Sequence, residues 1–181
     1  MTSTVTQGPD PVTQVDAYLA SLRAALGSRD PFEVLGATPS ELHHAIDGLS
    51  AESLNTPERP GKWAIRDVVQ HLADSELVGG YRFRMILAQD RPTLTGYDQD
   101  LWASRLRYAE VDAHTALEDF ARLRQANLRL LERASPTERK RIGIHTERGE
   151  ESIAQLIPTY AGHDIVHLRQ IARIRRAVGA S

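Results

Sequence analysis

The segment that decides the fold is Tyr160-Ala161-Gly162-His163-Asp164-Ile165-Val166-His167-Leu168-Arg169-Gln170-Ile171. His163 and His167 are four residues apart, so on a helix their side chains lie one turn apart on the same face. An unpaired buried polar group costs roughly 1–3 kcal/mol, so buried imidazoles need partners, and a metal ion shared with a third side chain would satisfy both. The face is expected to be buried because it forms an apolar stripe at steps of three or four residues: Leu156, Tyr160, His163, His167, Ile171 and Ile174.

Outward from this segment, apolar residues recur at helical spacing through most of the chain. The stripes predict helices over residues 12–26, 38–49, 64–90 and 111–134, and a last helix that starts at residue 152. Asp10 and Pro11 are expected to cap the first helix, and Pro158 is expected to kink the last one. One-sided helices joined by modest connections predict an all-α, up-and-down bundle.

Three shorter patterns refine this prediction. The pair Gly79-Gly80 lies inside the long third helix and predicts either a close helix contact or a bend. Residues 141–150 alternate briefly, as in a short hairpin or an extended segment. Ser152 and Gln155 form a capping-box pattern at the start of the last helix.

The composition excludes several classes of protein. The chain has 181 residues, a formal net charge of −2 and no cysteine. No overall positive charge attracts nucleic acid, and disulfides, thiolate zinc sites and cysteine nucleophiles are ruled out. A bound metal must be held by nitrogen and oxygen, and a reacting thiol must come from a substrate. Without an apolar run of roughly 18–20 residues or a signal pattern, we expect a cytoplasmic protein that binds no membrane.

A third imidazole can come from His71, in the segment Val69-Gln70-His71-Leu72-Ala73-Asp74-Ser75-Glu76. His71 lies at the edge between an apolar stripe and a polar strip, where two helices of a bundle could meet. Three protein nitrogens leave one metal position open, as in reactive rather than structural zinc sites. The alternative is that His163 and His167 are core histidines bonded to backbone or carboxylate, and that His71 is capped or solvated.

The residues around His71 also resemble a known family. The block 61–76 begins with Gly61-Lys62-Trp63 and carries His71-Leu72-Ala73-Asp74, and it resembles the characteristic block of the DinB/YfiT-like superfamily. Three further segments are similar to that superfamily in the same order, so the resemblance covers about residues 31–178: 92–103, 145–150 and 160–167. The resemblance implies a four-helix bundle over residues 31–181, preceded by an N-terminal extension, residues 1–30, with a short helix.

The resemblance also implies one divalent metal ion, zinc or nickel, held by His71, His163 and His167. Characterised enzymes of the superfamily use low-molecular-weight thiols such as bacillithiol or mycothiol, and other members are described as metal-dependent hydrolases. The leading hypothesis is therefore a metal-dependent thiol S-transferase with a small-molecule thiol and an electrophile as partners. Hydrolysis by metal-activated water and a non-catalytic metal-binding stress-response protein are the alternatives. A homodimer is consistent with the family.

Polar residues near the predicted ligands receive roles as hypotheses. Asp74, Glu76 and Asp164 are candidate bases for hydrolysis, and Asp164 could also add a carboxylate near the metal. Asp74, Ser75 and Gln170 are candidate outer partners for the second ring nitrogen of a ligand. Six arginines are expected mostly on a solvated face, with one of them able to clamp the carboxylate of a thiol cosubstrate: Arg82, Arg84, Arg169, Arg173, Arg175 and Arg176.

Overall fold

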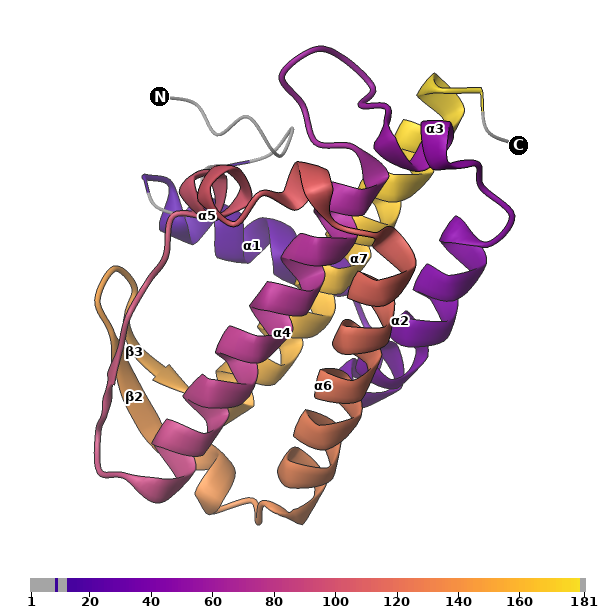
Figure 1. Ribbon diagram of the computed structural model, residues 1–181. Helices are drawn as coiled ribbons and strands as arrows, with labels where there is room; N and C mark the ends of the chain where they lie inside the picture. Colours follow the sequence, from indigo (N-terminus) through magenta and orange to yellow (C-terminus); the bar gives the residue numbers. More distant parts are fainter. Residues whose placement is uncertain (1–8, 10–12, 180–181) are drawn as a thin grey trace.

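The computed structural model describes residue 9 and residues 13–179, and most of this length is helical (Figure 1). The α-helices are α1 (Val15–Leu26), α2 (Pro31–Ile46), α3 (Ala51–Asn55), α4 (Ile65–Ala88), α5 (Gln99–Arg105), α6 (Ala113–Arg133) and α7 (Ile153–Ala177). The shorter elements are the strands β1 (Thr93–Leu94), β2 (Ile142–His145) and β3 (Gly149–Ser152) and the 3₁₀ turns η1 (Tyr108–Glu110) and η2 (Glu138–Lys140).

Four long helices form the bundle, which confirms the predicted fold class. Both α2 and α4 pack against α6 and α7, so α2 and α4 lie on one diagonal of the bundle and α6 and α7 on the other. The path differs in detail from strict up-and-down alternation, because α2 and α7 run in one direction and α4 and α6 in the other (Figure 1). The connection of residues 89–112 carries the chain back along the bundle before α6 begins.

The first two helices begin at other residues than the sequence predicts. The predicted cap at Asp10 and Pro11 lies outside the described residues, and α1 begins at Val15. α2 begins at Pro31 rather than near residue 38, because the carboxylate of Asp30 accepts hydrogen bonds from the backbone N–H groups of the first turn. The connection expected before residue 38 is therefore the first two turns of a helix.

Pro39 lies inside α2, where a proline removes one helical hydrogen bond. The carbonyl that loses its partner is that of Leu35, four residues earlier. Arg124 of α6 donates a hydrogen bond from Nη1 to this carbonyl oxygen at 2.9 Å. A contact from another helix therefore replaces the bond that the proline removes.

The last helix keeps its predicted start. Ser152 and Gln155 form a reciprocal capping box, and the helix then continues without interruption across Pro158 to Ala177. The predicted hairpin is also present, with β2 and β3 paired antiparallel. β1 adds a parallel strand to β2 that the sequence did not indicate. The small three-stranded sheet lies beside the ends of α4 and α7 (Figure 1).

Close helix contacts occur where the sequence predicts them. A Cβ atom at Gly79 would lie 2.6 Å from the ring of Tyr160 on α7, and one at Gly80 would lie 2.4 Å from the side chain of Asn127 on α6. The absence of side chains at the glycine pair therefore lets α4 approach both neighbouring helices, which confirms the predicted contact.

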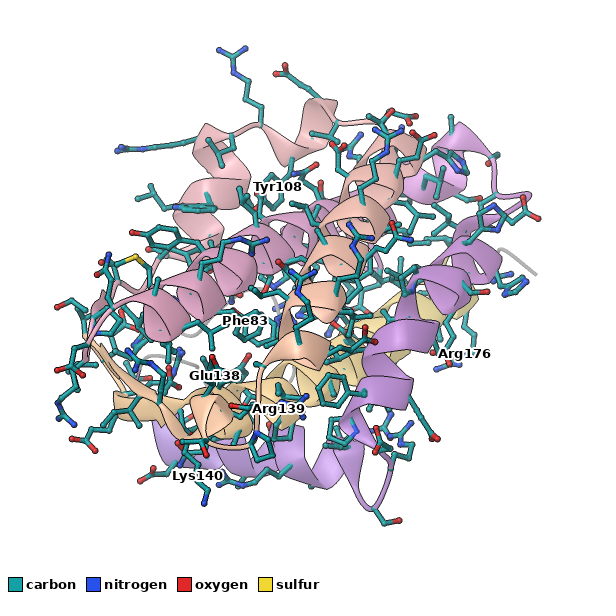
Figure 2. All side chains as sticks on the ribbon, turned by 90° about the horizontal axis from the view of Figure 1, so that it is seen from below. Phe83, Tyr108, Glu138, Arg139, Lys140 and Arg176 are labelled. Carbon is teal, nitrogen blue, oxygen red and sulfur yellow. The ribbon has the colours of Figure 1, made fainter. Side chains whose placement is uncertain are left out.

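A polar layer separates two apolar clusters along the bundle. One cluster includes Leu42, Val69 and Phe120, and the other includes Phe83 and Leu131. Figure 2 shows Phe83 lying among the helices, whereas Lys140 extends from the surface. The buried polar side chains between the clusters include His71, Glu76, Arg124, Asn127, Asp164 and His167. Within the described part of the chain, no helix combines the length and apolar character needed to cross a membrane.

Candidate metal centre

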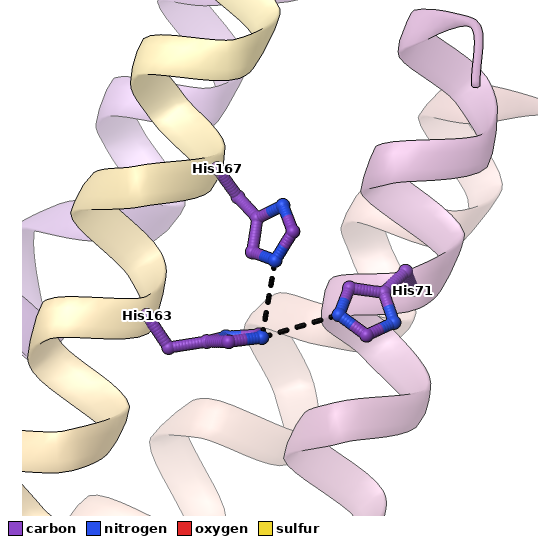
Figure 3. Close-up of side chains that lie close together, drawn as sticks. All are labelled: His71, His163 and His167. Carbon is purple, nitrogen blue, oxygen red and sulfur yellow. Dashed lines mark hydrogen bonds between the residues drawn. The ribbon is translucent and has the colours of Figure 1, made fainter. Parts of the chain in front are cut away.

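The three histidines predicted as metal ligands lie together between α4 and α7 and are called the histidine triad below (Figure 3). His71 projects from α4, and His163 and His167 project from successive turns of α7. The Nε2 atom of His163 is 3.1 Å from that of His71 and 3.1 Å from that of His167. His71 and His167 are each 2% exposed, whereas His163 is half-buried, so the triad is most accessible beside His163.

Hydrogen bonds alone do not satisfy these rings. His167 donates from Nδ1 to Oε1 of Gln170 at 2.8 Å, so its Nε2 atom carries a lone pair when the ring is neutral. Nε2 of His163 faces this lone pair and also Nε2 of His71, and a single nitrogen cannot donate to one and accept from the other with one hydrogen position. At most one of the two contacts is therefore a regular hydrogen bond between neutral rings.

A metal ion fits this arrangement. The three ligand atoms lie within 4.8 Å of one another. An ion bound tetrahedrally by nitrogens at about 2.0–2.1 Å holds them about 3.3 Å apart, close to the two separations observed. The lone pairs that oppose one another between the free rings would then all point at a cation. The residues present thus fit a three-nitrogen metal site.

Burial keeps the triad in the neutral form that binds metal. Burial lowers the pKa of His71 well below its usual value, and the nearby His167 lowers it further. Burial does the same to the pKa of His163, with additional lowering by His167, His71 and Arg124. Burial also lowers the pKa of His167 to about 4, against the hydrogen bond to Gln170, which raises it. At neutral pH none of the rings needs to lose a proton before it binds a cation.

The triad offers nitrogen ligands alone. Among the described residues, the group able to hold a metal consists of His71, His163 and His167, and no carboxylate joins it. Of the three predicted outer partners, Gln170 is the one that bonds to a triad ring. Nδ1 of His71 is buried and has no hydrogen-bond partner among the described residues.

The other two predicted outer partners bond elsewhere. Asp74 accepts a hydrogen bond from the hydroxyl of Tyr108 at 2.5 Å and another from Gln70 at 3.1 Å. The side chain of Ser75 hydrogen-bonds to that of Tyr97. His71 is instead covered by the ring of Trp63, whose centroid lies 4.9 Å from the imidazole centroid.

Glu76 and Asp164, two of the candidate bases, are held by a buried arginine. Arg124 binds both oxygens of Asp164, at 2.6 and 3.1 Å, and Glu76 at 2.8 Å. Asn127 donates a further hydrogen bond to Glu76 at 2.8 Å. Burial alone would lower the pKa of Arg124, but the two carboxylates outweigh this effect and raise it. The lone pairs of these carboxylates are committed to the ion-pair cluster.

Sequence reasoning missed two buried arginines. The sequence predicts no role for Arg124 and places Arg82 with the arginines of the solvated face, yet they are 2% and 6% exposed. A signal for Arg82 was present, because steps of four, four and three residues lead from His71 through Ser75 and Gly79 to Arg82 on one helix face.

The fold and the triad together define a helical-bundle protein with a cluster of three histidines that could hold a metal ion. The sequence model of the DinB superfamily matches residues 35–171, and the chain belongs to that superfamily, as its sequence resemblance predicted.

Curated relatives agree with this assignment, and a solved structure shares the fold. A protein of Bacillus mycoides (strain KBAB4), named "Putative metal-dependent hydrolase", is 31% identical over 137 residues, covering 76% of this chain and 79% of the relative. A relative with the same description from Oceanobacillus iheyensis is 32% identical over 136 residues, covering 75% and 78%. The structure of YfiT from Bacillus subtilis superimposes with a TM-score of 0.77 at 24% identity, covering 96% of this chain and 94% of YfiT. This likeness shows a shared fold.

Proposed function

We propose that the protein binds one divalent metal ion on His71, His163 and His167 and catalyses transfer of a low-molecular-weight thiol to an electrophilic small molecule. The observation that carries the proposal is the convergence of three neutral Nε2 atoms, 3.1 Å apart in two pairs, that hydrogen bonding cannot satisfy. Zinc and nickel both suit such a donor set, so the ligands do not choose between them.

The chemistry that the ion supplies when bound is Lewis acidity, which lowers the pKa of a thiol at the open position. The protein holds the ligands for this purpose: Gln170 fixes the ring orientation of His167, and Trp63 shields His71 from water. The nitrogen ligands are uncharged, so they leave the charge of the ion undiminished. In the transfer, the thiol proton goes to solvent, a sulfur–carbon bond forms, and the leaving group departs with its bonding electrons.

A thiol is favoured over water as the nucleophile by the state of the nearby carboxylates. An unperturbed cysteine thiol has a pKa of about 8.5, far below that of free water, so a thiol ionises without help from a strong base. Glu76 and Asp164 are both bound to Arg124 and are poorly placed to accept a proton from water. The chain has no cysteine, so the thiol has to be a cosubstrate.

Hydrolysis is the second candidate, and the names of the curated relatives favour it. It requires a group that accepts a proton from water. Asp74 is the candidate base that is not tied to Arg124, although Tyr108 and Gln70 both donate hydrogen bonds to it. The names of these relatives describe metal dependence. Under either candidate reaction, the metal ion would be held by the same triad.

The first test is the metal content of protein purified without a nickel column, measured by plasma mass spectrometry. We expect about one equivalent in the wild type and none in the His163→Ala variant. His114→Ala is the matched control, because His114 is exposed on α6 and should leave the metal content unchanged. Wild-type protein that carries no metal and takes up neither zinc, nickel nor manganese would refute the metal site.

The second test separates the two reactions. Metal-loaded protein is incubated with 1-chloro-2,4-dinitrobenzene in the presence and absence of mycothiol, bacillithiol or cysteine, and separately with p-nitrophenyl esters. We expect turnover that requires an added thiol and is lost in His163→Ala. Ester cleavage without thiol would favour the hydrolase, and bound metal without turnover on either panel would favour a non-catalytic metal-binding protein.

A further inference from the structure

Arg82 is a cation buried in the bundle without an anionic partner. Its side chain is 6% exposed, and Nη2 donates to the carbonyl oxygen of Thr95 at 2.7 Å and to Nε2 of His145 at 3.2 Å. Its Nε atom is buried and has no hydrogen-bond partner, and within the described ranges no carboxylate pairs with it. A buried charge without a counter-charge is costly, so this position calls for an anion.

The groups around Arg82 do not supply that negative charge. The hydroxyl of Tyr160 hydrogen-bonds to Arg82 and stays protonated, because burial raises its pKa. His145 is neutral, since burial together with Arg148 and Arg82 lowers its pKa to about 4. Arg148 is itself neutralised by Glu151, which accepts from Nε and Nη2 at 2.6 and 2.8 Å. The cluster therefore keeps the single positive charge of Arg82.

The position of Arg82 relates it to the histidine triad. His71, Ser75, Gly79 and Arg82 lie on one face of α4, and Tyr160, one turn before His163, lies on the facing side of α7. The Tyr160 ring occupies the place that a side chain at Gly79 would fill. Eleven residues along a helix span about 16 Å, and an arginine side chain leans back toward the helix N-terminus, so the guanidinium is roughly 10–15 Å from the triad.

Several side chains near this face are partly exposed at the surface. Tyr97, from the connection after β1, hydrogen-bonds to Ser75. The charge of Arg82 acts to lower the pKa of the Tyr97 hydroxyl, against the increase caused by burial. Tyr97, Arg148 and His163 are each partly exposed. A small molecule that entered beside these side chains would have His163 near one end and Arg82 near the other.

We propose that Arg82 binds the carboxylate of the small-molecule substrate or cosubstrate whose reactive atom reaches the histidine triad. The identity of the reacting end rests on the proposed function, whereas carboxylate binding at Arg82 does not. A carboxylate suits the site better than a phosphate, because one guanidinium and one phenol balance a single negative charge. A phosphate dianion would need a second free cation, and Glu151 already occupies Arg148.

The test compares propionate with propionamide, which has the same shape and no charge. Thermal unfolding of metal-free protein is followed at constant ionic strength with increasing propionate, propionamide or inorganic phosphate. We expect propionate to raise the Tm of the wild type and the two other compounds to have little effect. Equal effects of propionate and propionamide, or a larger effect of phosphate, would overturn the proposal.

Variants assign the effect to the residue. Arg82→Gln should weaken propionate binding by at least about 30-fold, because it removes one partner of a buried charge pair. Arg84→Gln removes the same charge from an exposed position two residues away and should keep wild-type binding. Tyr160→Phe is the second variant, for use if Arg82→Gln does not fold. It keeps Arg82 and the aromatic ring, and it should weaken propionate binding several-fold. Undiminished binding in the variant that folds would contradict the assignment.

The two proposals fail in different ways. His163→Ala should lose metal but keep propionate binding, since Arg82 does not depend on the triad for its charge. Propionate binding by wild-type protein that takes up neither zinc, nickel nor manganese would count against the proposed function alone. Metal binding and thiol transfer without any propionate effect would overturn the Arg82 proposal alone.

Discussion

At the scale of single residues, the amide of Gln170 controls the triad. Its Oε1 atom accepts from Nδ1 of the buried His167, which directs the Nε2 lone pair of that ring toward the other two histidines. Gln170→Leu keeps the approximate volume and removes this acceptor. We expect the metal affinity to fall about 10–100-fold, measured by competition with a chromogenic chelator.

Gln125→Leu is the control for this change, because Gln125 is exposed on α6. It should bind metal as the wild type does. If Gln170→Leu binds metal with unchanged affinity, the orientation of His167 is set by packing and the amide has no part in it.

His145 makes stability depend on pH. It accepts from Arg82 through Nε2, and its Nδ1 atom faces the N–H of Glu147, so a protonated ring would oppose two donors. Burial and the nearby arginines lower its pKa to about 4, below the value of about 6.5 in the unfolded chain. The unfolded state therefore takes up a proton first, and this contribution, complete above pH 6.5, is lost as the pH falls toward 4.

Urea unfolding of metal-free protein at pH 7 and pH 4.5 measures this effect. His145→Gln retains an acceptor without a titrating ring, so it should lose less stability over this interval than the wild type, by on the order of 2 kcal/mol. Equal losses in the two proteins would show that His145 does not titrate in this range.

The residues that sequence analysis found and missed differ in how their signal arises. His163 and His167 were identified because their spacing and apolar neighbours are local to one helix. Arg124 makes its contacts to three other helices, and no pattern within α6 records them. A buried arginine looks like a surface arginine until the packing of the helices is known.

At the scale of elements, Gly162 sets the distance between α1 and α7. A Cβ atom there would lie 2.3 Å from the carbonyl oxygen of Leu22 on α1, a backbone atom that cannot turn away. Gly162→Ala should therefore destabilise the protein by about 1–3 kcal/mol in urea unfolding, because the helices must separate to admit the methyl group.

Gly36→Ala is the matched control. Gly36 lies within α2, and nothing is within 4 Å of a Cβ atom built there. Alanine is the better helix former, so this variant should be more stable by about 0.5–1 kcal/mol. If both alanine variants shift the stability in the same direction, the close approach of α1 and α7 is not what matters at Gly162.

The element boundaries show where local signals are sufficient. The capping box of Ser152 and Gln155 was readable because both partners lie in one short segment. Asp30 and Pro31 form an equally local start signal, but Pro39 suggested a later start for α2. The proline is tolerated because Arg124 binds the freed carbonyl of Leu35, a compensation that depends on tertiary contacts.

At the scale of the whole molecule, one side chain connects all four helices of the bundle. Arg124 projects from α6 and binds Leu35 on α2, Glu76 on α4 and Asp164 on α7. Arg124→Met leaves two buried carboxylates without a counter-charge. We expect it to lose about 3–5 kcal/mol of stability in urea unfolding.

Two comparisons make this prediction specific. Arg122→Met removes an exposed arginine that pairs with Glu118 on the surface, and should cost less than about 1 kcal/mol. Combining Arg124→Met with Glu76→Met and Asp164→Leu removes all three charges and should recover most of the loss. If Arg124→Met alone is as stable as the triple variant, the carboxylates are neutral without Arg124.

The arrangement of the bundle was only partly predictable. Apolar stripes reveal how many helices bury a face, and they predicted the bundle correctly. An apolar stripe specifies neither the direction of its helix nor the helix against which it packs. It therefore could not show that α4 and α6 run parallel or that α2 and α4 lie on a diagonal. That order depends on the connection of residues 89–112, whose path no local pattern specifies.

The separation of the ligands along the chain has a consequence for biosynthesis. His71 and His163 are 92 residues apart, so a growing polypeptide presents one of the three triad histidines until α7 has been synthesised and docked against α4. A fragment that stops before α7 cannot capture the ion with more than a fraction of the final affinity. Under the proposed function, metal loading would follow folding, so truncated or misassembled chains would not retain the ion.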